Sequence, residues 1–186
     1  PAAWTLYVRP LLARLREEIA ALDAEGCVLA YADDTTLILI CEPDDIGISI
    51  SPKKTQFVAQ KLLNVVDNWC KESNQAVSVP KCAYLIFVPT EEEDKNTPDM
   101  LLEIGGEQIK REREFKLLGV WFDSLLTFEK HVSRVVRVVT AKLTALRDIA
   151  KQDWAGSREI RLSWKSLAEP HLRYGGGVWG CLLYTS

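Results

Sequence analysis

The stretch from Cys27 to Ile40 constrains the fold most, because two apolar runs there flank a pair of adjacent acids. The runs are rich in β-prone residues and bounded by short polar ones, which predicts a β-hairpin with Asp33 and Asp34 at its tip. Neighbouring carboxylates in an apolar frame repel each other and lose hydration, so a compensating charge is needed. Two divalent cations about 4 Å apart would supply it, and such a pair catalyses nucleotidyl transfer.

A turn without any chemistry explains the same dipeptide. Asp is a common turn residue, and Asp44-Asp45 repeats the pair outside any apolar frame. The dipeptide alone therefore leaves both interpretations open.

Composition narrows the class of protein. With 186 residues and 47% hydrophobic side chains, the chain can bury a core and is not disordered as a whole. No apolar run approaches the length of a membrane span, so no membrane partner is expected. The five cysteines form no Cys-x-x-Cys and only His131 and His171 could assist them, which argues against structural zinc or a disulfide framework. A reducing intracellular compartment is therefore favoured.

The charge is segregated along the chain. Residues 1–110 hold 10 Lys and Arg against 18 Asp and Glu, whereas residues 111–186 hold 13 against 8. An acidic, metal-collecting half joined to a basic half suits a polymerase fragment, and a charge-segregated scaffold would have the same distribution.

Hydrophobic periodicity and turn residues predict alternating helices and strands. The helices are expected over residues 3–23 (kinked or split at Pro10), 52–73 (after a connection at 42–51, with Ser51 as N-cap), 126–151 (with Thr127 as N-cap) and 158–168 (with Ser157 as N-cap). Strands are expected over 84–88 and 115–123, with a hairpin over 101–109 around Gly105-Gly106 and a solvated acidic loop over 90–98.

Several segments resemble, in order, the reverse transcriptases of non-LTR (LINE-type) retrotransposons. Tyr31-Ala32-Asp33-Asp34 in a hairpin resembles motif C, and residues 1–8 resemble the end of motif B. Ser-Val-Pro-Lys-Cys at 78–82 resembles motif D, with Lys81 at the lysine position and Cys82 where Thr is usual. Phe-Lys-Leu-Leu-Gly-Val-Trp-Phe-Asp at 115–123 resembles motif E, the primer grip, and Tyr-Gly-Gly-Gly-Val-Trp-Gly at 174–180 resembles the pattern after the thumb.

The resemblance implies an α+β fold: a partial polymerase palm, with an antiparallel sheet and helices on one face, followed by a helical thumb segment. The partial palm would span residues 1–122, carrying the end of motif B and motifs C, D and E, and the start of the thumb would span 123–180. Residues 181–186 back-translate without a break to TGTCTCTTATACACATCT, which looks like a transposase-library sequencing adapter. We expect this segment to be a read-through artefact.

The resemblance also implies roles for single residues. Asp33 would be the main carboxylate for two Mg²⁺ ions and Asp34 the weaker second ligand. Lys81 would stabilise charge or deliver a proton at the leaving pyrophosphate, although a solvated lysine explains it equally well. The nucleic acid would be contacted by Tyr31, Ala32, Leu118, Gly119, Val120, Lys130, Arg134 and Arg137. Gly119 would let a backbone approach closely; without the family it is a small residue in a buried strand, and the helix cations are a solvated face.

Activity and partners follow from the family. The substrates would be an RNA template, a DNA primer and dNTP, with the rest of a retrotransposon polyprotein in cis. The protein would work in the nucleus and in a cytoplasmic ribonucleoprotein. The third metal-binding Asp of the family comes from motif A, upstream of residue 1, so we expect the chain as given not to polymerise. A catalytically dead, reverse-transcriptase-derived RNA-binding or scaffold module is the alternative. A hydrolase unrelated to polymerases is disfavoured, because no His or Glu base lies near the hairpin.

Overall fold

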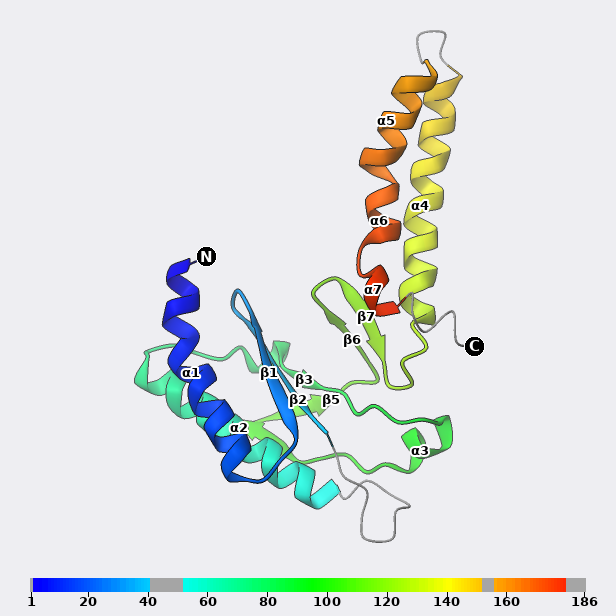
Figure 1. Ribbon diagram of the computed structural model, residues 1–186. Helices are drawn as coiled ribbons and strands as arrows, with labels where there is room; N and C mark the ends of the chain where they lie inside the picture. Colours follow the sequence, from blue (N-terminus) through cyan, green and yellow to red (C-terminus); the bar gives the residue numbers. More distant parts are fainter. Residues whose placement is uncertain (1, 41–51, 152–155, 180–186) are drawn as a thin grey trace. The chain divides into compact units, whose positions relative to one another are not determined.

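The structure, a computed structural model, describes residues 2–40, 52–151 and 156–179 (Figure 1). The expected connection over 42–51, its N-cap Ser51 and the segment 181–186 lie outside these residues. The described chain mixes helices with short strands, which confirms the α+β class. It forms two compact units, Pro1–Tyr84 with Lys95–Glu112 and Leu85–Asp94 with Arg113–Ser186, and each is described by itself.

The strands form three small sheets in the described part of the chain, where the resemblance implied one antiparallel sheet. β1 (Gly26–Tyr31) pairs with β2 (Asp34–Leu39), and β6 (Glu114–Leu117) pairs with β7 (Val120–Asp123), both antiparallel. The third sheet has the order β3-β5-β4, and its β3–β5 pair is parallel. Within the described residues, the strands of the expected antiparallel sheet are therefore divided among three sheets, one of which is partly parallel.

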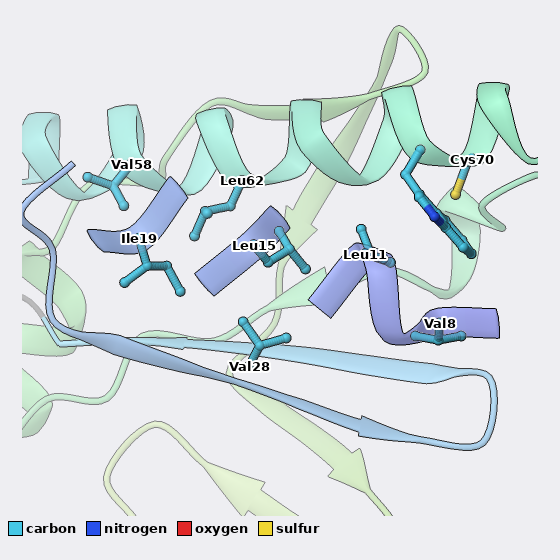
Figure 2. Close-up of a cluster of buried hydrophobic side chains, with 9 residues drawn as sticks. Val8, Leu11, Leu15, Ile19, Val28, Val58, Leu62 and Cys70 are labelled. Carbon is cyan, nitrogen blue, oxygen red and sulfur yellow. The ribbon is translucent and has the colours of Figure 1, made fainter. Parts of the chain in front are cut away.

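The first unit is organised around two long helices. α1 (Ala2–Ala21) packs against both α2 (Pro52–Glu72) and β1. Figure 2 shows side chains from α1, α2 and Val28 of β1 meeting in one cluster, in which Leu15 and Leu62 are fully buried. Each such side chain contributes about 1.5–3 kcal/mol relative to an exposed one, so this cluster holds the hairpin and both helices together.

Pro10 lies inside α1, which runs on as one assigned helix from Ala2 to Ala21. Of the kink or split expected at this residue, the split is wrong, and the kink stays a prediction. Proline removes one backbone hydrogen bond from a helix interior, which is costly in isolation. Pro10 is exposed, while Val8 and Leu11 beside it are buried in the core cluster. Packing of that buried face therefore maintains the helix through the proline.

The three-stranded sheet is fastened to α2. It consists of β3 (Ala83–Tyr84), β4 (Leu102–Ile104) and β5 (Glu107–Arg111), and it follows a short 3-10 helix, η1 (Val79–Lys81). The Gln60 side chain donates to the carbonyl of Glu103 at 2.8 Å and accepts from its N–H at 2.9 Å. These two hydrogen bonds satisfy the backbone of Glu103 on the outer edge of β4. Among the described residues, no other strand pairs with that edge.

β3 is much shorter than the strand expected over 84–88. Only Ala83 and Tyr84 have partners, Lys110 and Arg111, and β5 ends at Arg111. Residues 85–88 therefore have no ladder to join there, and Val88 instead donates its N–H to Ser124 O, at 2.9 Å, in the other unit's fold. The strand prediction was right in position and wrong in length.

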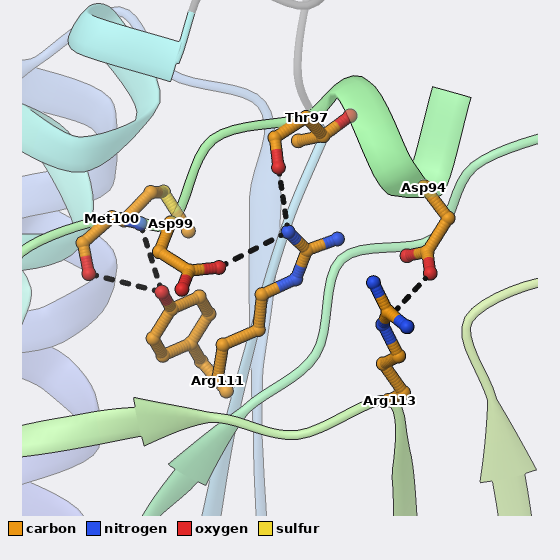
Figure 3. Close-up of polar contacts among 7 residues, drawn as sticks. Asp94, Thr97, Asp99, Met100, Arg111 and Arg113 are labelled. Atoms are coloured by element: carbon orange, nitrogen blue, oxygen red, sulfur yellow. Dashed lines mark hydrogen bonds and ion pairs between the residues drawn. The ribbon is translucent and has the colours of Figure 1, made fainter. Parts of the chain in front are cut away.

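A polar cluster holds the loop before β4 (Figure 3). The Arg111 guanidinium, which is mostly buried, donates to Thr97 O at 2.7 Å and pairs with Asp99 at 3.2 Å. The Tyr84 hydroxyl bonds both the N–H and the carbonyl of Met100. Burial raises the pKa of Tyr84, so the phenol stays protonated and keeps both bonds at neutral pH.

The acidic segment expected to be a solvated loop is a helix, α3 (Glu91–Asn96), whose first four residues belong to the second unit. Thr90 Oγ1 accepts the N–H of Glu93 at 3.2 Å, and the first turn is acidic, which complements the helix dipole. Asp94 is buried and pairs with Arg113 at 3.1 Å (Figure 3). The loop prediction was wrong because it treated every acid in the run as solvated.

The strand expected over 115–123 is a hairpin. β6 and β7 are joined by Leu118 and Gly119, with Leu117 paired to Val120. Both turn residues have positive φ, +46° and +90°, which is the left-handed backbone of tight two-residue turns. Glycine adopts it freely, so Gly119 marks the turn that the sequence interpretation missed.

α4 (Glu129–Ala150) begins two residues after the expected N-cap Thr127. Phe128 takes that place in left-handed conformation, and the Asp123 carboxylate accepts the N–H groups of Leu125, Thr127 and Phe128. One acid at the end of β7 therefore satisfies the donors just before the helix, while the Thr127 hydroxyl accepts the N–H of Glu129, the first residue of α4, at 3.4 Å.

Three shorter helices follow and pack on α4 or on one another: α5 (Ser157–Leu167), α6 (Glu169–Arg173) and α7 (Gly176–Trp179). Gly156, not the expected Ser157, is the N-cap of α5. The unit buries Ala168 completely, along with Phe128, Val139 and Leu146. Among the described residues, every helix is too short or too polar to span a lipid bilayer.

Candidate functional site

The predicted acidic hairpin exists, with its tip one residue earlier than expected. Tyr31 pairs with Asp34 across the ladder, so the turn consists of Ala32 and Asp33. Asp34 is the first residue of β2. Residues paired across an antiparallel ladder share a face, and the Tyr31–Asp34 face is exposed along the hairpin, whereas Val28 on the opposite face is buried in the core cluster. The carboxylates therefore stand at the solvent-facing end of a hairpin whose other face is anchored.

The turn itself is strained. Ala32 has φ +52°, a left-handed backbone that costs a non-glycine residue about 1–2 kcal/mol. Strain of this kind persists only where the surroundings hold it, and it gathers at functional sites. The indole N–H of Trp4 donates a hydrogen bond to the Ala32 carbonyl, which ties the turn to α1.

The carboxylates of Asp33 and Asp34 are exposed and have no hydrogen-bond or ion-pair partner in the part of the chain that the structure describes. Carboxylate oxygens are the donors that Mg²⁺ prefers, so the chemistry of this pair fits the metal. Two carboxylates are too few ligands for a two-metal centre. Within residues 2–40, 52–151 and 156–179, no three His, Cys, Asp or Glu side chains lie close enough together to hold a metal ion. The described residues alone therefore do not make a two-metal centre.

Lys81 lies at the end of η1, in the same unit as the hairpin, and is exposed. No hydrogen bond or ion pair joins it to either aspartate among the described residues. Its expected role at a leaving pyrophosphate stays a prediction.

In the second unit, the expected primer-grip residues are contacted by the chain's own later segment, although Leu118 and Gly119 remain exposed. The Tyr174 hydroxyl donates to Leu118 O, and a Cβ on Gly119 would lie 2.9 Å from the Tyr174 ring. A Cβ on Gly175 would lie 2.8 Å from Val120, which is itself buried. Gly119 is small because a tyrosine ring lies against it, which is a different reason from the expected approach of a nucleic-acid backbone. Contact of Leu118, Gly119 and Val120 with nucleic acid stays a prediction.

Two of the expected helix cations are organised by an aromatic ring. Trp121 of β7 has Lys130 Nζ at 4.9 Å and the Arg134 guanidinium at 4.1 Å from its ring centroid. Lys130 also pairs with Glu114 on β6. Such cation–π contacts are worth about 0.5–1 kcal/mol each at exposed sites and hold long side chains in place. Arg137, one turn further along α4, is exposed and has no such partner among the described residues.

A buried histidine lies beneath this surface. His131 accepts the N–H of Trp121 at Nδ1, at 3.4 Å, and its ring lies 5.7 Å from that of Trp179. Its Nε2 is buried with no partner among the described atoms. Burial lowers the pKa of His131 below 6.5, because the charged ring would lose hydration. The neutral ring is therefore the native form, with its hydrogen on Nε2.

Three curated proteins that this chain resembles are all encoded by mobile or retrotransposable elements. The chain is 25% identical over 174 residues to the "RNA-directed DNA polymerase from mobile element jockey" of Drosophila melanogaster, covering 87% of this chain. It is 26% identical over 176 residues to the protein of the same name in Drosophila funebris. The "Putative 115 kDa protein in type-1 retrotransposable element R1DM" of Drosophila melanogaster matches at 24% over 181 residues, covering 96% of this chain.

The chain is similar to proteins of LINE-type retrotransposons, two of which are named RNA-directed DNA polymerases. It spans about a sixth of the length of these curated relatives, at 16%, 17% and 16%. No family model and no solved structure matches it. The homology confirms the resemblance inferred from the motifs.

Sequence reasoning missed Trp4, Trp121 and Tyr174, three aromatic residues that hold the predicted site residues in place. Trp121 could have been found, because Lys130 and Arg134 are one helical turn apart and follow an aromatic strand residue. Tyr174 begins the Tyr-Gly-Gly-Gly-Val-Trp-Gly string, which marked the segment, but nothing in the sequence pointed to its partner Leu118. Trp4 carried none, because 28 residues separate it from Ala32.

Proposed function

We propose that this chain is part of a reverse transcriptase that extends a DNA primer on an RNA template; two of its relatives are named RNA-directed DNA polymerases. The observation that carries the proposal is the strained, exposed Ala32-Asp33 turn with Asp34 beside it, in a chain homologous to RNA-directed DNA polymerases. Residues 1–122 are the proposed palm portion and residues 123–180 the proposed start of the thumb. The two compact units have other bounds, because the chain passes from one unit to the other after Tyr84, after Asp94 and after Glu112.

In this proposal Asp33 and Asp34 are metal ligands, and a third carboxylate is supplied by the longer polypeptide. The two carboxylates neither pair with a cation nor cap a helix among the described residues, so they are available as ligands. Two Mg²⁺ ions would there lower the charge of the reacting phosphate. Lys130, Arg134 and Arg137 supply cations for the phosphate backbone of the template and primer.

Primer extension on an RNA template with Mg²⁺ tests the proposal. The 186-residue chain and a polypeptide extended upstream through motif A are compared, each with Asp33→Asn. We expect extension by the longer polypeptide, its loss by at least about 100-fold in the variant, and none by the short chain. Extension that survives Asp33→Asn in the longer polypeptide would refute the assignment of Asp33.

A second candidate function is an RNA-binding module without catalysis. The observation that favours it is the lack of any third metal-binding side chain near the acids within the described residues. RNA binding unaffected by Asp33→Ala, together with no extension by the longer polypeptide, would support this candidate instead.

A further inference from the structure

The tip of the acidic hairpin lies beside the N-terminal end of α1 (Figure 1). The Trp4 indole N–H donates a hydrogen bond to the carbonyl of Ala32. That carbonyl belongs to the peptide group whose nitrogen is that of Asp33. The bond therefore fixes the peptide plane through which the backbone enters Asp33.

The tip needs such a contact because the core of the unit does not reach it. Val28 is the buried residue of β1, and from Ala30 to Thr35 every residue is exposed. An isolated two-stranded hairpin is marginally stable in water, so strands alone hold the turn weakly. The left-handed backbone at Ala32 adds a cost that favours rearrangement of the turn.

Trp4 is itself held by the core through a second aromatic residue. Its ring lies 5.5 Å from that of Tyr7, which meets the buried Trp69 of α2 edge-on at 5.4 Å. The Tyr7 hydroxyl also donates to Ser73 O, at 3.2 Å, just past the end of α2. Aromatic pairs of this geometry are worth about 0.5–1.5 kcal/mol beyond their buried area, so the three rings form a rigid connection from α2 to the turn.

We propose that Trp4 is a positioning residue for the Asp33–Asp34 site, acting through the Ala32 carbonyl and touching no reacting atom. The catalytic part of this inference, that Trp4 supports the reaction by positioning Asp33 and Asp34, rests on the proposed function. The geometric part, that Trp4 holds the turn, stands without it.

Amide and indole NMR on the 186-residue chain tests the geometric part. Trp4→Phe keeps a ring against Tyr7 and removes the N–H donor, while Tyr7→Phe removes a hydroxyl from the same aromatic set and leaves that donor in place. In Trp4→Phe we expect the order parameters of the Asp33 and Asp34 amides to fall from about 0.85 toward 0.6 or less. Tyr7→Phe keeps both ring contacts and should lower them much less than Trp4→Phe does, and core amides of α2 should be unchanged in both variants.

The Trp4 indole proton gives a direct signature of the bond. It should exchange with solvent at least about tenfold more slowly than an exposed indole, as a hydrogen-bonded donor does. Free exchange of this proton, or unchanged order parameters at Asp33 in Trp4→Phe, would overturn the proposal.

Extension by the longer polypeptide tests the catalytic part. Trp4→Phe should lower kcat by roughly 10- to 100-fold, since misplacement by about 1 Å has such effects, and leave KM for dNTP within about twofold. A longer polypeptide that does not polymerise at all would contradict the proposed function, while the NMR result would still decide the role of Trp4. Unchanged kcat in Trp4→Phe, with wild-type extension intact, would overturn the positioning role alone.

Discussion

At the scale of single residues, the structure explains several side chains through groups on other elements. Gly119 adopts φ +90° with the Tyr174 ring against it, and His131 of α4 accepts a backbone N–H from Trp121 of β7. Each of these contacts joins two different elements of the second unit. A substitution at such a position therefore disturbs two elements at once.

Gly119→Ala should destabilise the second unit. Left-handed backbone costs alanine about 1–2 kcal/mol, and the new Cβ would displace the Tyr174 ring from Leu118 O, so we expect about 2–3 kcal/mol in total. Denaturant unfolding measures the change. Gly177→Ala is the matched control, because a Cβ there meets no atom within 4 Å, and its stability should be unchanged or slightly raised. Equal losses in both variants would contradict the role given to Tyr174.

His131 should make stability depend on pH. Its folded pKa lies below the unfolded value of 6.5, so its contribution is complete above pH 6.5, falls as the pH drops below 6.5, and levels off below the folded pKa. The slope reaches at most about 1.36 kcal/mol per pH unit. Protonation would also place a hydrogen on Nδ1, where the Trp121 N–H already points.

The measurement is denaturant unfolding followed at α4 amides between pH 5 and about 8. His131→Asn keeps an acceptor for Trp121 without titrating, so it should remove this part of the pH dependence. His171→Asn, at an exposed histidine, should retain it. A wild-type pH profile in His131→Asn would assign the dependence to other groups.

At the scale of elements, side chains form hydrogen bonds with backbone groups that have no partner in a helix or a sheet. The Asp123 carboxylate satisfies three N–H groups before α4, and Gln60 satisfies the backbone of Glu103 at the edge of β4. Buried or half-buried backbone groups without partners cost about 1–3 kcal/mol each, so these two residues fix where the elements begin and dock.

Gln60→Glu should weaken the docking of β4 on α2. The substituted carboxylate cannot donate to Glu103 O and repels it, so we expect a loss of about 1–3 kcal/mol. Amide exchange of the Glu103 N–H should rise together with the loss of global stability. Gln56→Glu adds the same charge one turn earlier on α2, at a residue with no such bond, and should cost less than about 0.5 kcal/mol. Similar losses in the two variants would show a charge effect instead.

At the scale of the whole molecule, the proposed nucleic-acid partner has to be bound by a chain of net charge −3. The acids concentrate in the first 110 residues, and cations dominate the rest. Trp121, Lys130 and Arg134 combine a ring with two cations on the second unit. Local charge, more than net charge, governs contacts with a phosphate backbone.

Arg134→Gln should therefore weaken binding to an RNA–DNA hybrid and lower the salt dependence. Each lost phosphate contact reduces the slope of log K against log salt by about 1. Binding titrations at several salt concentrations measure it. Lys151→Gln removes the same charge at the end of α4, where Lys151 pairs with Asp148, and should leave the slope nearly unchanged. Identical slopes for wild type and Arg134→Gln would remove Arg134 from the interface.

Much of the fold could be predicted because its signals are local. The helix over 52–73, the Gly105-Gly106 hairpin and the acidic hairpin follow from periodicity and turn residues within short windows. The wrong predictions concern segments whose structure depends on residues outside the local window. Residues 85–88 are no strand because β5 ends at Arg111, and the run at 91–96 is a helix with Asp94 buried against Arg113.

By itself the sequence determined the class of the chain, its homology to LINE-type polymerases, and the hairpin that presents Asp33 and Asp34. These depend on residue identity and on spacings of a few positions, which a linear reading contains. Only the tertiary structure decided that Trp4 holds the Ala32 carbonyl, that Tyr174 contacts Gly119, and that Trp121 gathers Lys130 and Arg134. Those contacts join elements brought together by burial of their apolar faces, and that packing is a property of the folded chain as a whole.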